Sequence, residues 1–278
     1  RWLATARRGY PDIALQASGR DDDISPRYYD LMAKLEYDAA PGHTFSFHAL
    51  RAGDGLRYER TNSPSLSSGY GSNQVWGRWR GEMSAGLRGE AVLAWNRLTW
   101  NRQGGGRQDG FPFSLTDHRE LDLVSLRNEW SGQTGDSAVW RTGLEAGKGA
   151  AEYDYALSRQ RSVVSGVAQV VATDRKVVRL EPEGTSAAAF AAVKFRVAGP
   201  LVAEPGLRWE RAGHVGGATL TPRLNAALAL GATVIRAAWG NYAQRQGLHE
   251  LSVADGERVF GRVERAEHRV VGLERAIG

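Results

Sequence analysis

The stretch that decides the fold is Leu220–Gln244, LTPRLNAALALGATVIRAAWGNYAQ. It reads as two strands joined at Gly231-Ala232, because apolar and polar residues alternate on both sides of this dipeptide. A two-residue turn sets Leu228 opposite Ile235, so the apolar positions of both strands fall on one face. A slip of one residue would move them all to the other face, so the register is well specified. The non-apolar face carries Arg223, Asn225, Arg236, Tyr242 and Gln244.

The composition favours strands and turns. The 278 residues suffice for one large β-domain or about two ordinary domains. They include 34 glycines, 9 tryptophans and 9 tyrosines but only 2 methionines. Mean hydropathy is -0.42, and no apolar run approaches the roughly 18 residues of a membrane helix. A helical membrane protein is therefore excluded, whereas a membrane β-barrel is not, because its alternating strands are only mildly hydrophobic.

Charge and cysteine content remove several functional classes. The chain has no cysteine, which excludes disulfides, thiolate catalysis and cysteine-ligated metal sites. Its net charge is +5, but the basic residues are spread along the chain rather than clustered, so we expect no nucleic-acid partner. The chain begins at Arg1 without an initiator Met and enters a strand-like segment at once, which indicates a piece of a longer protein.

The same alternation recurs along the chain and predicts about twelve strands, with no amphipathic helix. Expected loops cover Thr61–Gly71, Gln103–Phe113, about 156–185, Gly213–Ala218 and the stretch from the opening hairpin to about Val263. The expected strands are Trp2–Arg8, Tyr28–Asp38, Thr44–Arg60, Asn73–Glu82, Leu87–Arg102, Leu115–Ser131, Val139–Tyr155, Ala187–Val197, Leu201–Arg211, the two strands of Leu220–Gln244, and Glu267–Arg275.

Short and long connections alternate between these strands. In an up-and-down sheet, this places every tight turn on one rim and every long loop on the other. Many strands exceed the usual length of about 5–6 residues, which is typical of outer-membrane barrels. A soluble antiparallel barrel or sandwich is the alternative, because alternation alone does not say which face is inside, although sandwiches use shorter strands and Greek-key crossings.

Several strings resemble the barrel of TonB-dependent outer-membrane receptors. The resemblance follows the family's order over nearly the whole chain. The strings are Trp2–Leu15 (WLATARRGYPDIAL), Ser25–Asp54 (SPRYYDLMAKLEYDAAPGHTFSFHALRAGD), Thr221–Leu228 (TPRLNAAL), Ile235–Leu251 (IRAAWGNYAQRQGLHEL) and Arg265–Arg275 (RAEHRVVGLER).

The resemblance implies a 22-stranded barrel with an N-terminal plug domain, which imports scarce ligands such as siderophores with energy from TonB. We therefore expect residues 1–278 to form an incomplete, antiparallel, up-and-down transmembrane β-barrel domain. The plug is expected before Arg1, and the closing strands with the family's terminal aromatic are expected after Ile277-Gly278. Expected partners are the outer-membrane bilayer, the protein's own plug, TonB and a small-molecule ligand.

No motif predicts catalysis, a metal site or a cofactor. The six histidines form neither a close ligand pair nor an HExxH-type motif, and His48 is expected to bond to Ser46 on the polar face. Asp21-Asp22-Asp23 lacks the spacing of a calcium loop and reads as solvated. Gly104-Gly105-Gly106 has no strand-to-helix context for a phosphate cradle and reads as a flexible loop.

In a barrel, the non-apolar face would line the lumen. Arg223, Asn225, Arg236, Tyr242 and Gln244 are therefore the candidate residues for contact with the plug or, as an alternative, with the ligand. The five tryptophans expected in an outer aromatic girdle are Trp95, Trp100, Trp130, Trp140 and Trp239.

We thus expect a non-enzymatic receptor of the outer membrane. A passive porin-like channel is the main alternative, because it shares the barrel and lacks the plug. A soluble β-domain for binding or adhesion is a third hypothesis, and it predicts that Leu228, Ile235 and Trp239 are buried while Arg223 and Arg236 are exposed. Ligand specificity would lie in loops with no readable code.

Overall fold

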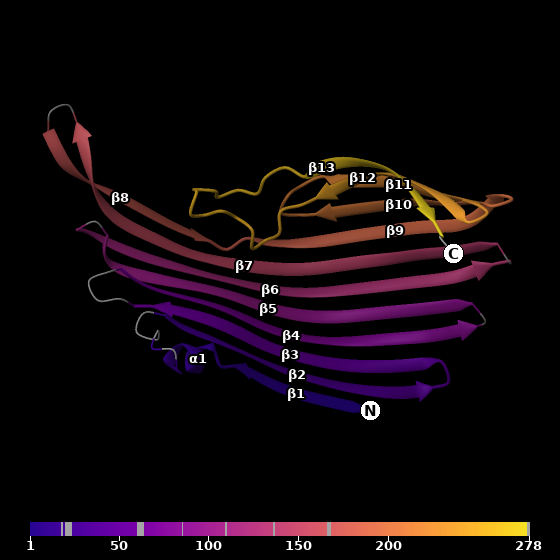
Figure 1. Cartoon of the computed structure of the whole chain (residues 1–278), viewed down its shortest axis with the longest axis horizontal. Coiled ribbons are helices and arrows are strands. Elements are labelled where there is room, and N and C mark those ends of the chain that lie inside the picture. The colour runs from indigo at the N-terminus through magenta and orange to yellow at the C-terminus, as the bar shows by residue number, and fades with distance from the viewer. Residues whose placement is uncertain are drawn as a thin grey trace.

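The computed structural model describes residues 1–17, 19, 24–59, 64–84, 86–108, 110–135, 137–165 and 168–276. These residues form one antiparallel sheet and one short helix (Figure 1). The helix α1 spans Pro11–Ala17. The strands are β1 Trp2–Gly9, β2 Ile24–Ala40, β3 His43–Tyr58, β4 Ser65–Ser84, β5 Leu87–Gln108, β6 Phe111–Thr134, β7 Ala138–Ser165, β8 Ala168–Leu180, β9 Glu183–Ala198, β10 Leu201–Ala212, β11 Ala218–Leu230, β12 Thr233–Gln244 and β13 Glu264–Arg275.

The sheet is up-and-down, with almost every strand paired to its neighbours in sequence. The exception is β7, which pairs with β8 along its second half and with β9 along its first half. The same register runs through both partners, so β8 and β9 form one line of strand interrupted at Glu181-Pro182. Twelve strand positions therefore lie across the sheet, as the sequence predicts. Among the described residues, β1 and β13 do not pair with each other, so the sheet is open, as expected of part of a larger barrel.

Five tight turns lie together at one end of the strands, the right end in Figure 1. The hairpin that decides the fold has the predicted register, with Leu230 opposite Thr233 and Leu228 opposite Ile235. Its turn residue Gly231 has a φ of 58°, which an L side chain rarely adopts. A glycine with positive φ occurs in each of the five turns, at Gly42, Gly86, Gly135, Gly199 and Gly231.

Strict alternation gives the sheet two different faces. We define the inner face as the one that carries Tyr153, and the outer face as the opposite one. The outer face is apolar and uncovered along the half of the sheet near the tight turns, where Leu93 is 58% and Leu144 is 64% exposed. The outer face also carries Leu35, Phe47, Val75, Leu126, Leu224, Ile235 and Trp239.

We name this apolar surface the outer apolar band. A row of polar residues forms its boundary on the side away from the tight turns. Arg51, Asn73, Arg97 and Asp122 stand opposite one another on β3 to β6. Arg97 and Asp122 form an ion pair of 2.7 Å. On β5, the stretch Leu87–Trp95 lies between the row and the tight turn, and its length matches the roughly 9–11 residues with which a strand crosses a bilayer.

A soluble β-domain predicts that Arg223 and Arg236 are exposed, as they are, but it also predicts that Ile235 and Trp239 are buried, which they are not. Ile235 is 36% exposed and Trp239 is 39% exposed, and neither is covered by another layer of the chain. No helix among the described residues is long and apolar enough to cross a membrane.

Three segments predicted as loops are instead largely strand. Ser65–Gly71 belongs to β4, Gly104–Gly106 to β5, and residues 156–165 and 168–180 to the hairpin of β7 and β8. Glycine and serine are weak strand formers alone, but here both neighbouring strands supply hydrogen-bond partners, so pairing overrides local propensity. The sequence pattern also does not predict the short helix α1. The expectations for Asp21-Asp22-Asp23 and Ile277-Gly278 lie outside the described residues.

Candidate ligand-binding site

The five residues that the sequence predicts as a site share the inner face. Thr219 stands opposite Glu210, Glu210 opposite Ala188, and Ala188 opposite Glu145, which lies on the same side of β7 as Tyr153. Alternation from Thr219 places Arg223 and Asn225 on the inner face. Their partners across the hairpin, Gly240 and Ala238, place Arg236, Tyr242 and Gln244 there as well. Whether these residues contact a plug or a ligand stays a prediction.

The structure brings only some of these five residues together. The Arg223 guanidinium lies over the Tyr242 ring, 4.5 Å from its centroid, and the same ring lies 4.6 Å from that of His268. Arg236 does not join the contact between Arg223 and Tyr242. Its guanidinium instead donates to the Glu274 carboxylate at 2.9 Å. Gln244 ends β12 and is exposed.

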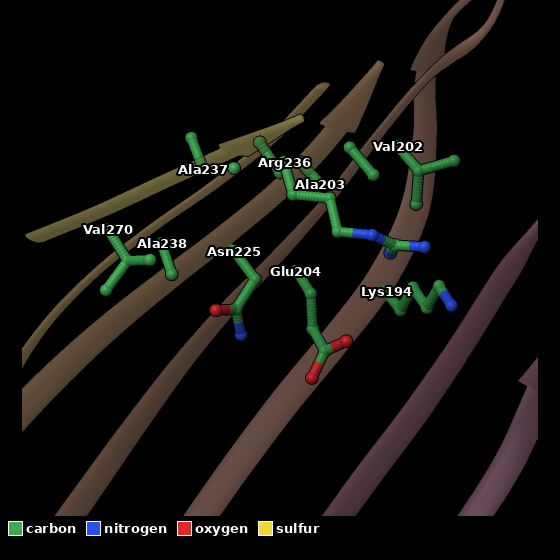
Figure 2. Close-up of a pocket in the computed structure, with 12 residues that line it drawn as sticks. Lys194, Val202, Ala203, Glu204, Asn225, Arg236, Ala237, Ala238 and Val270 are labelled. Carbon is green, nitrogen blue, oxygen red and sulfur yellow. The ribbon is translucent and has the colours of Figure 1, made fainter. Parts of the chain in front are cut away.

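Asn225 and Arg236 line an open hollow of about 440 Å³ (Figure 2). Figure 2 shows their side chains on the same side of the strands as Glu204 and Lys194. The hollow thus carries two cations, one carboxylate and one amide. Its floor is formed by small residues such as Ala227 and Ala238. It is a shallow polar surface, suited to contact with another protein surface more than to enclosing a small molecule.

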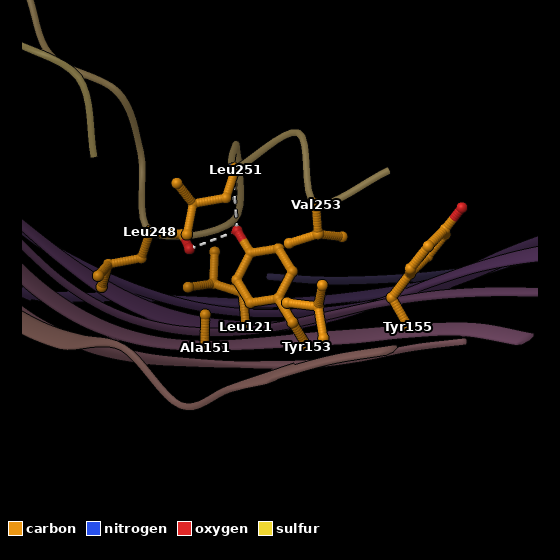
Figure 3. Close-up of a cluster of buried hydrophobic side chains, with 8 residues drawn as sticks. Leu121, Ala151, Tyr153, Tyr155, Leu248, Leu251 and Val253 are labelled. Atoms are coloured by element: carbon orange, nitrogen blue, oxygen red, sulfur yellow. Dashed lines mark hydrogen bonds between the residues drawn. The ribbon is translucent and has the colours of Figure 1, made fainter. Parts of the chain in front are cut away.

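A second, better enclosed region lies further from the tight turns, where residues 245–263 fold onto the inner face. We name this stretch the inner segment. Figure 3 shows it above the sheet, with Leu248, Leu251 and Val253 pointing toward side chains of β6 and β7. Tyr153 is 1% exposed at the centre of this contact. Its hydroxyl donates to the Leu248 carbonyl oxygen at 2.7 Å and accepts from the Leu251 amide at 3.1 Å.

The contact between the inner segment and the sheet forms the hydrophobic core. Burying such side chains stabilises the docked segment by roughly 1.5–3 kcal/mol each, before the cost of ordering the chain. Partly buried Leu98, Trp100 and Phe260 pack around the cluster. The buried members are Leu121, Ala151, Tyr153, Tyr155, Val178, Leu248, Leu251 and Val253.

Polar contacts from several strands also hold the inner segment. Arg119 on β6 donates to the Leu251 carbonyl oxygen at 3.3 Å, and Lys176 on β8 donates to the Ala254 carbonyl oxygen at 2.5 Å. At its start, Arg245 is ion-paired with Glu210 and donates to Thr219 Oγ1 at 2.9 Å. The segment is therefore fixed to strands on both sides of β7.

A cavity of about 560 Å³ lies beside the inner segment. Trp100 forms one wall, with the His249 ring stacked on it at 5.3 Å and the Tyr70 ring meeting it edge-on at 5.5 Å. Arg102 and Asp117 also line the cavity. Flat rings with a few fixed polar groups are typical of small-molecule sites.

A charged triad forms the polar end of this cavity. Asp117 is 3% exposed and accepts from Arg119 at 2.9 Å and from Arg102 at 2.5 Å. It lies on β6 beyond the polar row, outside the outer apolar band. Burial raises the pKa of the Asp117 carboxyl. The hydrogen bonds from Arg119 and Arg102 lower this pKa by more than burial raises it, so it lies below its ordinary value of 3.8. The Asp117 carboxyl is therefore ionised near neutral pH. Together with the two guanidinium groups, it leaves one net positive charge in the triad.

Sequence reasoning missed this cavity and misplaced one of its residues. The expectation that Trp100 belongs to an outer girdle is wrong, because Trp100 lies on the inner face against His249. On β5, Trp95 stands opposite Val124 and faces outward. Trp100 is an odd number of positions further along the strand, so it faces inward. This spacing could have been read from the sequence. Trp95, Trp130, Trp140 and Trp239 do lie on the outer face. His48 bonds to Ser46 Oγ at 3.0 Å, as expected.

Comparison with solved structures identifies the fold. The ferric preacinetobactin receptor BauA from Acinetobacter baumannii matches 92% of this chain with a TM-score of 0.62 and 13% sequence identity. The copper transporter OprC matches 100% of it with a TM-score of 0.68 and 12% identity. The outer membrane transporter YddB from Escherichia coli matches 92% with a TM-score of 0.68 and 11% identity.

These matches cover only part of the other proteins. The chain spans 46% of BauA, 47% of OprC and 38% of YddB. Neither a family model nor a curated protein sequence matches the chain. The expected fold, part of the larger barrel that TonB-dependent receptors have, is thereby confirmed.

Proposed function

From the fold of an outer-membrane transporter barrel, we propose that the chain is part of an outer-membrane receptor that takes up a small molecule with energy from TonB. The observation that carries the proposal is the contrast between the two faces. The outer face is apolar and uncovered over a length that fits a bilayer, whereas the inner face is polar and holds the inner segment. The proposal assigns this chain binding and transport, not catalysis.

The aromatic cavity and the inner segment supply the ligand-binding part of the proposal. The cavity beside Trp100 lies beyond the polar row. In the proposed receptor this end, away from the tight turns, would face the outside of the cell, because outer-membrane barrels have their short turns on the periplasmic side. The inner segment forms one wall of the cavity through His249. Ligand bound there would contact the inner segment directly, and the surface around Arg223 and Arg236 would be left for the plug.

A conductance measurement separates the receptor from the passive channel. The complete protein is reconstituted into planar lipid bilayers, and the steady ion current is recorded. A receptor whose lumen holds a plug is expected to give little steady current, whereas an open porin-like channel passes current continuously. Sustained current from the untreated protein would favour the channel.

Binding of TonB tests energy coupling independently. The purified C-terminal domain of TonB is titrated into the complete protein in detergent and followed by calorimetry. Saturable binding is expected for the receptor. A protein that gives neither binding nor current would match neither transport function.

A further inference from the structure

The hairpin of β7 and β8 projects beyond the rest of the sheet (Figure 1). We name residues 156–180 the arm, leaving out 166 and 167, which the structure does not describe. On one side of β8 lies β7, and among the described residues no strand pairs with its other side. The arm therefore has a free edge of backbone groups, which is a template for another strand.

The register shows which residues of β8 point to this free edge. The Ala151 amide donates to the Pro182 carbonyl oxygen at 2.8 Å, and the same register continues without a shift along β7 and β8. Residues that bond across an antiparallel pair alternate with residues that point away. Even-numbered residues of β8 thus bond to β7, and the backbone groups of Val171, Thr173 and Arg175 point to the free edge.

A second contact agrees with this assignment. The Arg258 guanidinium donates to the Val177 carbonyl oxygen at 3.3 Å, and Val177 has the same parity as Thr173. The inner segment thus satisfies the edge at Val177. Among the described residues, no backbone or side-chain hydrogen bond meets the edge at Val171, Thr173 or Arg175.

The net positive charge of the arm indicates which kind of partner strand could pair with its free edge. Its sequence contains five basic residues, Arg159, Arg161, Arg175, Lys176 and Arg179, and one acidic residue, Asp174. Arg159 and Arg161 share Asp174, and Arg179 pairs with Asp154 at 3.3 Å. Arg175 has no acidic partner among the described residues. Two arms paired edge to edge would bring like charges together, so the charge disfavours a second copy and favours an acidic strand.

We propose that the free edge of β8 at Val171–Arg175 binds an extended, acidic peptide segment of a partner protein by adding it as a further strand. Backbone hydrogen bonds at Val171, Thr173 and Arg175 supply the affinity, and the basic side chains of the arm select acidic residues. This docking surface lies outside the cavity at Trp100 and does not depend on the transport function.

The test uses a fluorescent peptide, Glu-Val-Thr-Val-Glu-Val-Thr-Val-Glu, and the complete protein in detergent, with binding measured by fluorescence anisotropy. The key variant is Thr173→Pro, which removes an edge N–H that is not used in pairing with β7, so the arm itself keeps its hydrogen bonds. Thr173→Val is the matched control, because it keeps the N–H.

We expect the peptide to bind saturably to the wild-type protein and to the Thr173→Val variant. Thr173→Pro is expected to bind about tenfold more weakly, the effect of roughly one lost hydrogen bond. Arg175→Glu is expected to weaken binding in a salt-dependent way. The same peptide N-methylated at every residue has no backbone N–H on either edge. It tests the backbone contact without altering the protein, and it is expected not to bind.

Equal binding of the N-methylated peptide would overturn the proposal, because the attraction would then be charge alone. Equal binding to Thr173→Pro and Thr173→Val would overturn it as well. Light scattering is run in parallel. A dimer that is lost in Thr173→Pro would assign the edge to a second copy and would also overturn the proposal.

Discussion

The hydroxyl of Tyr153 on β7 donates a hydrogen bond of 2.7 Å to the carbonyl oxygen of Leu248 in the inner segment. This bond joins the wall of the sheet to a residue 95 positions later in the chain. The Tyr153 hydroxyl oxygen also accepts a hydrogen bond from the Leu251 amide at 3.1 Å, so one buried side chain satisfies both a backbone acceptor and a backbone donor. The inner segment is therefore attached to the sheet at a defined point, beside the aromatic cavity.

Replacing Tyr153 with Phe is expected to loosen the inner segment. The ring still fills the core, but the buried Leu248 carbonyl and Leu251 amide lose their partner, at a cost of about 1–3 kcal/mol. Hydrogen exchange of residues 248–254 should become faster. Tyr155→Phe is the control, because Tyr155 is also buried and no described hydrogen bond involves its hydroxyl. Equal acceleration in both variants would contradict the role of the Tyr153 hydroxyl.

Replacing Trp100 with Ala is expected to free His249, because their rings stack at 5.3 Å and such a contact contributes about 0.5–1.5 kcal/mol beyond area burial. The chain has no cysteine, so the substitution Ser252→Cys provides a single thiol in the inner segment. Its reaction with a water-soluble thiol reagent should be faster in the Trp100→Ala background. Trp95→Ala, on the outer face of the same strand, should leave the rate unchanged. A faster rate with Trp95→Ala alone would contradict the assignment of the two faces.

Attachment of the inner segment is expected to weaken in acid. The folded pKa of Asp117 lies below its ordinary value, so its ion pairs stabilise the folded state above the unfolded pKa. That contribution is lost as the pH falls through the lower, folded pKa, below about pH 4. Accessibility of the thiol introduced by Ser252→Cys is taken as its reaction rate divided by that of free cysteine at the same pH, because the thiolate fraction of any thiol falls in acid. This relative rate should rise over this range. With Asp117→Asn added, the relative rate should already be high at neutral pH and change little with acid. A relative rate that stays flat while Asp117 is intact would contradict the prediction.

A charge on the outer apolar band is expected to oppose insertion. Ile235→Arg should destabilise the protein folded in lipid by about 2–4 kcal/mol if the site lies near the bilayer midplane, and by less near the interfaces. Ala238→Arg, on the inner face of the same strand, is the control. Urea titrations of the complete protein in lipid vesicles measure both. A larger loss from Ala238→Arg would indicate that the two faces had been assigned in reverse.

The sequence is sufficient to predict the sheet and its faces. Alternation alone places Leu228 opposite Ile235 and sets Arg223 and Arg236 on the other side, because a period of two leaves only one register that gathers the apolar residues. The ends of the strands are not predictable in the same way. Gly104–Gly106 and Ser65–Gly71 read as loops, yet they lie in strands because neighbouring strands supply their hydrogen bonds.

The site is less predictable than the fold. The residues around Trp100 and Tyr153 come together only because the inner segment folds back onto the sheet, and no local pattern in 245–263 indicates that contact. The parity of Trp100 relative to Trp95 is the one readable signal. The residues predicted instead, Arg223 and Tyr242, do contact each other on the inner face, and their partner is still to be identified.

The most direct test of the account is a pair of spin labels at positions 235 and 236, in the complete protein reconstituted in lipid. Adjacent residues of one strand face opposite sides, so each label is a control for the other. In an outer-membrane barrel, the label at 235 is expected to be accessible to lipid-soluble oxygen, whereas the label at 236 is expected to be shielded from it. A label at 235 that is shielded, with the label at 236 open to aqueous reagents and away from lipid, would mean a soluble β-domain and would contradict the transport function.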